Sequence, residues 1–110
     1  MREKSTAGPL GTVIAIKLEG NKFFKKESYE DAANMYHKAI IELEELKANK
    51  VGVPKKEITE LDVSCRLNYA NAKSKIKQYD DAIYQVKKVL KLGSNLKAYF
   101  RLGDCYYNMG

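Results

Sequence analysis

Hydrophobic and polar residues follow the period of an α-helix along most of the chain. The first helix is predicted from Thr12 to Lys26, after eleven residues that we expect to form a flexible lead-in. Lys17 and Asn21 stand four residues apart on this helix and therefore share one face. The neighbouring face is apolar or small and consists of Val13, Ile16, Gly20 and Phe23. One face can thus pack against the protein while the other offers hydrogen-bond donors.

A second helix follows a tight turn near Glu27. Ser28 and Asp31 have the Ser-x-x-Asp spacing that is typical of a helix N-terminus. The helix should fray before Gly52, which suits a helix C-terminus, and Pro54 suits the first turn of the next helix. Its predicted buried stripe consists of Ala32, Tyr36, Ala39, Ile40, Leu43 and Leu46.

Three more helices complete the pattern. The third is predicted from Lys55 to Lys77, with a buried side formed by Ile58, Leu61, Leu67 and Ala70. The fourth begins at Tyr79 and ends at Gly93, with an apolar stripe of Ala82, Ile83, Val86, Val89 and Leu90. Ser94 or Asn95 can cap a fifth helix. One side of that helix carries Leu96, Tyr99, Leu102, Gly103 and Tyr106.

The helices contain an internal repeat. The sequence Tyr-Glu-Asp-Ala-Ala at residues 29–33 recurs as Tyr-Asp-Asp-Ala-Ile at residues 79–83. Small residues, Gly20, Ala70 and Gly103, occupy matching places in the first helix of each pair, where close helix contact requires a minimal side chain. The chain therefore reads as consecutive helix pairs of one design.

Length and composition limit the classes of function. The chain has 110 residues, enough for a single domain, and its 45% hydrophobic and 31% charged residues suit a soluble helical protein. A net charge of +6 favours acidic peptides or polyanions as partners over basic ones, although lysine also serves simply to solubilise exposed helix faces. The short apolar run near Val13 is neither a signal peptide nor a membrane span.

The sequence offers no pattern for catalysis or metal binding. Cys65, Cys105 and His37 lack the spacing of a zinc site, and we expect both thiols to be buried and reduced. Reduced thiols favour an intracellular compartment. The chain also lacks a nucleophile motif and a glycine-rich phosphate loop. We therefore predict neither an enzyme nor a bound cofactor.

The repeat resembles the tetratricopeptide repeat (TPR) family, whose helix-turn-helix units have small, aromatic and alanine residues at set positions. The first unit matches through Gly20, Phe23, Ala32, Tyr36 and Ala39. The second unit matches through Ala70, Tyr79 and Ala82, and a third begins with Gly103 and Tyr106 in register. The resemblance implies an all-α fold of antiparallel helix pairs stacked in a right-handed superhelix. Its units span about 13–50, 63–95 and, incompletely, 96–110, with 51–62 as linker and helix extension.

Within that family, the chain looks like the two-carboxylate-clamp subgroup. The subgroup binds the Glu-Glu-Val-Asp C-terminus of heat-shock chaperones through five donor residues. The matching positions in this chain are Lys17, Asn21, Asn68, Lys97 and Arg101. Carboxylates only accept hydrogen bonds, so ammonium, guanidinium and amide groups suit them. Secondary contacts in the same groove are expected from Phe24, Asn71, Ser74 and Lys75, although Phe24 equally suits core packing.

The chain looks most like the co-chaperone domain of FKBP-type immunophilins, without the isomerase domain. The implied partner is the tail of a 90-kDa or 70-kDa heat-shock chaperone in the cytoplasm, with neither nucleic acid nor membrane involved. The turn before Lys97 is one residue shorter than the family pattern and lacks its proline. The third unit stops before its second helix, which should leave Tyr99, Leu102 and Tyr106 uncovered and keeps self-association open.

Two alternative functions remain at this stage. A TPR scaffold could bind a different protein, and a basic helical domain with eight tyrosines could bind nucleic acid. The second alternative lacks a recognised basic helix or stacking motif. Titration with a Glu-Glu-Val-Asp peptide that has a free C-terminus, with its amidated form and with a duplex oligonucleotide would distinguish these two alternatives from the carboxylate clamp.

Overall fold

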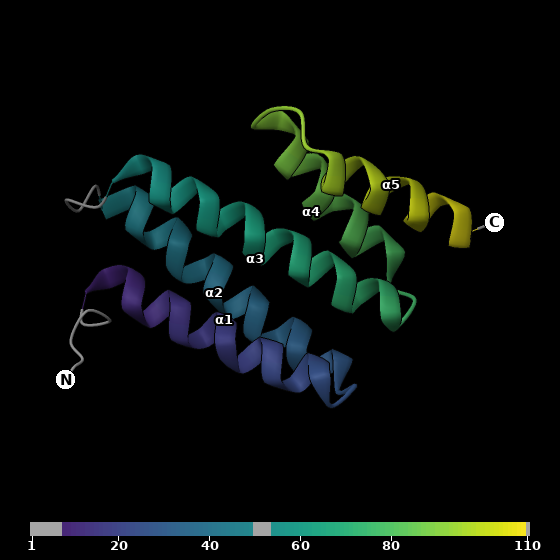
Figure 1. Ribbon diagram of the computed structural model, residues 1–110, viewed down its shortest axis with the longest axis horizontal. Helices are drawn as coiled ribbons and strands as arrows, with labels where there is room; N and C mark the ends of the chain where they lie inside the picture. Colours follow the sequence, from purple (N-terminus) through teal and green to yellow (C-terminus); the bar gives the residue numbers. More distant parts are fainter. Residues whose placement is uncertain (1–7, 50–53, 110) are drawn as a thin grey trace.

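The protein is a stack of antiparallel α-helices (Figure 1). The structure is a computed structural model that describes residues 8–49 and 54–109, and these residues contain helices and no strand. Each helix packs against the next, and the central helix α3 also contacts α1 and α5. The expected all-α class is confirmed. The helices are α1 (Pro9–Lys25), α2 (Tyr29–Asn49), α3 (Lys55–Lys75), α4 (Tyr79–Lys91) and α5 (Leu96–Met109).

The first helix begins earlier than predicted. We expected a flexible lead-in through residue 11, but α1 starts at Pro9, with Gly8 as its N-cap. Proline is favoured at the first helical position because its missing N–H has no helical partner there and its φ angle already suits a helix. The backbone N–H of Gly11 donates to the carbonyl of Gly8 at 3.0 Å. The remaining lead-in, residues 1–7, lies outside the described residues.

The turns α1–α2 and α3–α4 have the same backbone geometry. Glu27 and Lys77 adopt left-handed φ angles of 63° and 64°. The N–H of Ser28 donates to the carbonyl of Phe23, and the N–H of Gln78 donates to that of Lys73, both at 2.9 Å. This bonding across five residues, with a left-handed residue inside it, is the Schellman motif. It ends α3 at Lys75, two residues before the predicted end.

The other predicted ends agree closely with the structure. Asn95 caps α5, because its Oδ1 accepts a hydrogen bond from the N–H of Ala98 at 3.0 Å. Gly93 follows α4 with a φ of 144°, a conformation that favours glycine. Pro54 precedes α3 as its N-cap rather than lying in its first turn. Gly52, the expected C-terminal signal of the second helix, lies outside the described residues.

The core is built from the predicted stripes of α2 and α4. It forms two layers, one where α3 packs on α1 and α2 and one where α3 packs on α4 and α5. On α2 the buried residues are Ala32, Ala33, Tyr36, Ala39, Ile40 and Leu43. On α4 they are Ala82, Ile83, Gln85, Val86 and Val89. Because α3 contributes to both layers, it fixes the position of one helix pair against the other.

Close helix contact occurs at two of the three predicted small residues. A Cβ atom at Gly20 would lie 2.7 Å from Cε1 of Tyr36, so α1 and α2 approach through the missing side chain. Ala70 is fully buried where α3 meets α4. The prediction is wrong for Gly103, where an added Cβ would meet nothing within 4 Å. Among the described residues, no element packs on that side of α5.

Replacing Gly20 by alanine is expected to lower the free energy of unfolding by about 1–3 kcal/mol. The added methyl group would collide with the ring of Tyr36, which is only 2% exposed and cannot withdraw into solvent. Urea denaturation followed by circular dichroism measures the change. Gly103→Ala is the matched control, because it adds the same methyl group to a helix in open space. Equal destabilisation by both changes would contradict the packing argument.

Charged residues are buried between the two layers. Asp62 and Arg66 of α3 are 2% and 4% exposed. The Nε of Arg66 donates to Asp62 Oδ1 at 3.0 Å, and its Nη groups donate to Glu44 and Gln85. Lys47 donates to Asp62 Oδ2 at 3.1 Å. This ion network, buried at Asp62 and Arg66 and exposed at Glu44 and Lys47, ties α3 to α2, and Gln85 ties it to α4.

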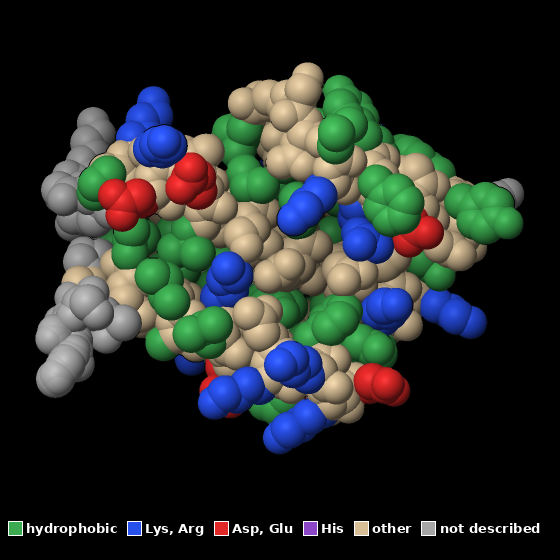
Figure 2. Space-filling view, in the orientation of Figure 1, with side chains coloured by type: hydrophobic (Ala, Val, Ile, Leu, Met, Phe, Trp, Pro, Cys, Tyr) green, Lys and Arg blue, Asp and Glu red, His purple; other side chains and the backbone are tan. Residues whose placement is uncertain are grey.

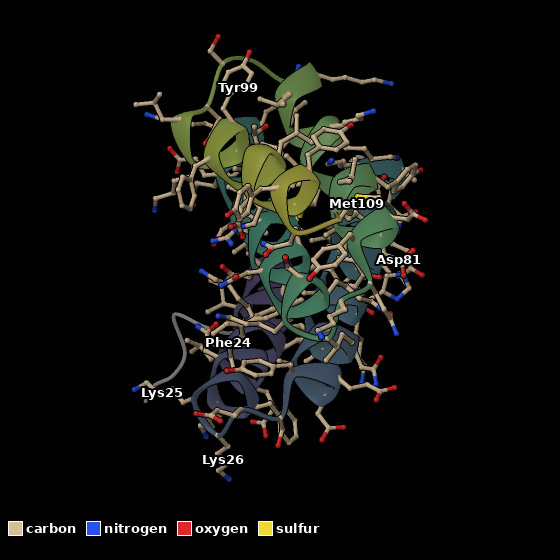
Figure 3. All side chains as sticks on the ribbon, turned by 90° about the vertical axis from the view of Figure 1, so that its right-hand side faces the viewer. Phe24, Lys25, Lys26, Asp81, Tyr99 and Met109 are labelled. Carbon is tan, nitrogen blue, oxygen red and sulfur yellow. The ribbon has the colours of Figure 1, made fainter. Side chains whose placement is uncertain are left out.

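The outer side of α5 is exposed. Ala98 and Cys105 are the buried residues of this helix, whereas Tyr99 and Tyr106 are 54% and 49% exposed. The prediction that this side lacks cover is confirmed for both tyrosines, and Leu102 is half-buried. Figure 3 labels Tyr99, in the first turn of α5, and Met109, at its last residue.

Both cysteines are free and buried, as predicted. No described helix is long and apolar enough to cross a membrane. Residues 8–49 and 54–109 contain no cluster of three or more side chains suited to hold a metal ion.

Candidate functional site

Three adjoining hollows follow α3. The first, of about 310 Å³, is lined by Asn21, Phe24, Lys25, Tyr36, Asn68 and Asn71. The second, of about 560 Å³, is lined by Val63, Ser64, Leu67, Asn68, Asn95, Leu96 and Lys97. The third, of about 220 Å³, is lined by Asn71, Ser74, Lys75, Lys77, Tyr79, Arg101, Asp104 and Asn108. Asn68 belongs to the first and second hollows and Asn71 to the first and third. We refer to the three together as the groove.

The groove is formed mainly by α1, α3 and α5. Figure 2 looks onto these three helices, and blue Lys and Arg side chains flank a central band of uncharged groups. Figure 3 shows Phe24 and Lys25 on one side of the molecule and Asp81 on the other. The groove is therefore rich in hydrogen-bond donors and bordered by positive charge.

The structure brings Asn21 and Asn68 together. They lie on α1 and α3, far apart in sequence, and both line the first hollow. Gly20 of the same helix packs on Tyr36 of α2, and half-buried Phe23 packs in the same cluster. The division of α1 into a packed face and a donor face follows from the helical period that was read from the sequence.

Lys17 lies beside the groove rather than among the residues that line its hollows. It is half-buried, one turn before Asn21. Burial raises the pKa of the Cys65 thiol to about 11, and the ammonium group of Lys17 partly opposes that rise. Lys17 is therefore near α3. Within the described residues, no carboxylate forms an ion pair with it.

Lys97 and Arg101 enter different hollows. Lys97 is exposed and shares the second hollow with Asn68. Arg101 lines the third hollow with Asn71, and its Nη1 lies 3.5 Å from Asp104 Oδ2. The guanidinium group also lies 5.7 Å from the ring centre of Phe100. The two cations of α5 are thus adjacent to the groove but do not meet Asn21 in one hollow.

The secondary residues all line the groove. Asn71, Ser74 and Lys75 come from the last turns of α3, and Ser74 Oγ also lies 3.7 Å from the sulfur of Cys105. Phe24 lines the first hollow and packs edge-on against Tyr29, with ring centres 5.0 Å apart. Phe24 therefore both packs against the core and lines the first hollow, and its contact with a ligand stays a prediction.

Sequence reasoning missed several residues of the groove. Tyr36 was assigned only to the core, yet its hydroxyl donates to Asn21 Oδ1 at 2.6 Å. Asp104 places a carboxylate beside Arg101, and Lys25 and Lys77 add positive charge. The spacing of Arg101 and Asp104, three apart on a helix, was a signal for their pairing. The contact between Tyr36 and Asn21 joins two helices and has no local signal.

Two curated proteins are similar to this chain in sequence. The chain is 31% identical over 103 residues to Arabidopsis thaliana peptidyl-prolyl cis-trans isomerase FKBP42, covering 92% of this chain and 28% of that protein. It is 28% identical over 96 residues to Arabidopsis thaliana outer envelope protein 61, covering 86% of this chain and 16% of that protein. The chain therefore spans less than a third of each curated relative. No family model matches it.

A solved structure is similar over almost the whole chain. It is the C-terminal TPR-containing domain of a Plasmodium falciparum FK506-binding protein, with a TM-score of 0.77 and 29% sequence identity. The similarity covers 96% of this chain and 70% of that one.

Proposed function

Because the chain is a TPR domain similar to that of FKBP-type proteins, we propose that it binds the C-terminal Glu-Glu-Val-Asp tail of a cytoplasmic 90-kDa or 70-kDa heat-shock chaperone. TPR domains are protein-interaction modules built from stacked helix pairs with an extended concave surface. The proposal adds to this general role a specific ligand and five residues that bind it. They are Lys17, Asn21, Asn68, Lys97 and Arg101.

The position of Asn68 is the observation that carries the proposal. Asn68 lines both the first hollow, which Asn21 also lines, and the second, which Lys97 also lines. Two amides and an ammonium group can therefore approach one ligand end. Such a tail ends in two carboxylates, the terminal one and the Asp side chain, and both groups only accept hydrogen bonds.

The expected affinity is modest. A hydrogen bond to a charged group contributes about 1.5–3 kcal/mol, and ordering a flexible tail opposes a large part of that gain. A micromolar dissociation constant corresponds to about 8 kcal/mol. Four or five such contacts, less the cost of ordering, are consistent with this scale.

The test is a titration with three ligands. A fluorescein-labelled Glu-Glu-Val-Asp peptide with a free C-terminus should bind with a micromolar dissociation constant, as measured by fluorescence polarisation. The C-terminally amidated peptide should bind about tenfold more weakly, because one charge-assisted contact is lost. Equal binding of the two peptides would refute the clamp and favour a TPR scaffold with another protein partner. Tighter binding of a duplex oligonucleotide would favour the nucleic-acid alternative.

Replacing Asp104 by asparagine should strengthen binding of the free-acid peptide about twofold to fivefold. The Asp104 carboxylate pairs with Arg101 at 3.5 Å in the third hollow, and surface pairs of this kind contribute up to about 1 kcal/mol. Its removal frees the guanidinium group and removes a repulsive charge. Fluorescence polarisation with the same peptide measures the change.

Asp81→Asn is the matched control for Asp104→Asn. It removes the same charge on the side of the molecule away from Phe24 and Lys25, where Asp81 pairs with Lys73 at 3.5 Å (Figure 3). We expect its effect on peptide affinity to stay below about twofold, because Asp81 lines none of the three hollows and solvent and salt screen its exposed charge. If both variants gained affinity equally, overall charge and not competition for Arg101 would be responsible.

A further inference from the structure

A hydrogen bond between Tyr36 of α2 and Asn21 of α1 joins the two helices of the first pair at the groove. The Tyr36 hydroxyl donates to Asn21 Oδ1 at 2.6 Å. Both residues line the first hollow, together with Asn68. The Tyr36 side chain is 2% exposed, and its ring packs so closely on the backbone at Gly20 that a Cβ there would lie 2.7 Å away. The hydroxyl is therefore held in a fixed position beneath the amide of Asn21.

This bond decides which end of the Asn21 amide faces the groove. An asparagine amide has an acceptor oxygen at one end and a donor NH₂ at the other, and rotation by half a turn exchanges them. The distance of 2.6 Å lies in the usual range for O–H···O and below that for N–H···O. Burial raises the pKa of Tyr36 to about 12, so the hydroxyl keeps the proton that it donates. The oxygen of Asn21 is thus occupied, and its NH₂ group remains for another partner.

On the basis of the proposed function, we propose that Tyr36 is a positioning residue that makes the groove selective for a carboxylate. With its oxygen held by Tyr36, Asn21 presents only N–H donors to a ligand, which match an acceptor-only group. Without that restraint, Asn21 could turn its oxygen to the groove and accept a hydrogen bond from a carboxamide. Tyr36 therefore acts through Asn21 and need not touch the ligand.

The test is a double-mutant cycle with Tyr36→Phe, Asn21→Ala and their combination, measured with the free-acid and amidated Glu-Glu-Val-Asp peptides. Tyr36→Phe keeps the ring that packs on Gly20 and removes only the hydroxyl. It should weaken free-acid binding about threefold to tenfold, the range for one lost hydrogen bond. It should weaken amide binding less, so the ratio between the two affinities falls. In the Asn21→Ala background, Tyr36→Phe should change neither affinity by more than about twofold, because its target is absent.

Tyr69→Phe is the matched control. Tyr69 is a half-buried tyrosine of the same hydrophobic cluster as Tyr36, and it does not line the groove. We expect no change in the ratio between free-acid and amide affinities. An equal loss for Tyr36→Phe with and without Asn21 would overturn the proposal, since Tyr36 would then act by another route. An unchanged ratio in Tyr36→Phe would do the same.

A measurement without peptide separates this proposal from the proposed function. In ¹⁵N-labelled protein, the side-chain NH₂ resonances of Asn21 are identified by their loss in Asn21→Ala. They should shift in Tyr36→Phe and stay in place in Tyr69→Phe. Unshifted resonances would show that Tyr36 does not hold the amide, whatever the peptide does. Shifted resonances in a protein that binds both peptides equally would instead refute the chaperone-tail ligand.

Discussion

Arg66→Ala is expected to lower the free energy of unfolding by about 3–5 kcal/mol, the usual cost of breaking a buried ion pair. The change would leave Asp62, which is 2% exposed, with Lys47 as its remaining cation, and would take the donors away from Gln85 and Glu44. A small domain is stable by only about 5–15 kcal/mol. This variant should therefore be partly unfolded in moderate urea, as measured by circular dichroism.

Arg101→Ala is the matched control for Arg66→Ala. Both variants remove an arginine that pairs with a carboxylate on its own helix, but the Arg101 pair is open to solvent, with side chains 24% and 36% exposed. Exposed pairs contribute about 0–1 kcal/mol. The two losses should therefore differ by several kcal/mol. Similar losses would mean that burial is not what makes Arg66 important.

Lys97→Glu should weaken binding of the free-acid Glu-Glu-Val-Asp peptide about tenfold or more. An exposed ammonium group that attracts a carboxylate would be replaced by a carboxylate that repels it, beside Asn68 in the second hollow. The midpoint of thermal unfolding should hardly change, because Lys97 is on the surface of the first turn of α5. Fluorescence polarisation and a thermal melt of the same sample measure both quantities.

Lys87→Glu is the control for Lys97→Glu. It makes the same change of charge on α4, at an exposed residue that lines none of the three hollows. Its effect on peptide affinity should be small and should vanish as salt is added. Arg101→Ala, which also serves as the stability control, should weaken peptide binding severalfold without unfolding the domain. Unchanged affinity in both Lys97→Glu and Arg101→Ala would exclude α5 from the site.

Local sequence signals predicted the helices and their ends well. The stripes on α2 and α4, the Asn95 cap and the small residue at Gly20 all depend on spacings within a few residues, so one sequence is enough to see them. The end of α3 was missed because the turn uses Lys77, a residue with no preference for a left-handed φ. The turn is stabilised by backbone hydrogen bonds, which any residue can make, so the side chains around Lys77 do not indicate where the helix ends.

The charged interior of α3 could not be predicted from its period. Asp62 and Arg66 have no local signal of burial, because charged side chains are rarely buried unless they are paired. Their partners lie on α2 and α4, and only the packing of three helices brings Glu44 and Gln85 to one guanidinium group. The same limit applies to the Tyr36 hydroxyl and Asn21, which belong to different helices. The groove residues that were predicted, such as Asn21, Asn68 and Lys97, came from the family resemblance and not from the helical period. Their roles in binding remain predictions.

The matching turns at Glu27 and Lys77 have a consequence for engineering the chain. Each holds an ordinary residue in a left-handed conformation that glycine adopts without steric cost. Both residues are exposed, and their backbone bonds would survive a change of side chain. The two turns belong to separate helix pairs, so changes there should act independently. They are two sites at which the scaffold can be made more robust while the core keeps its native side chains. A change at Glu27 also leaves the groove intact, whereas a change at Lys77 removes one positive charge from the third hollow.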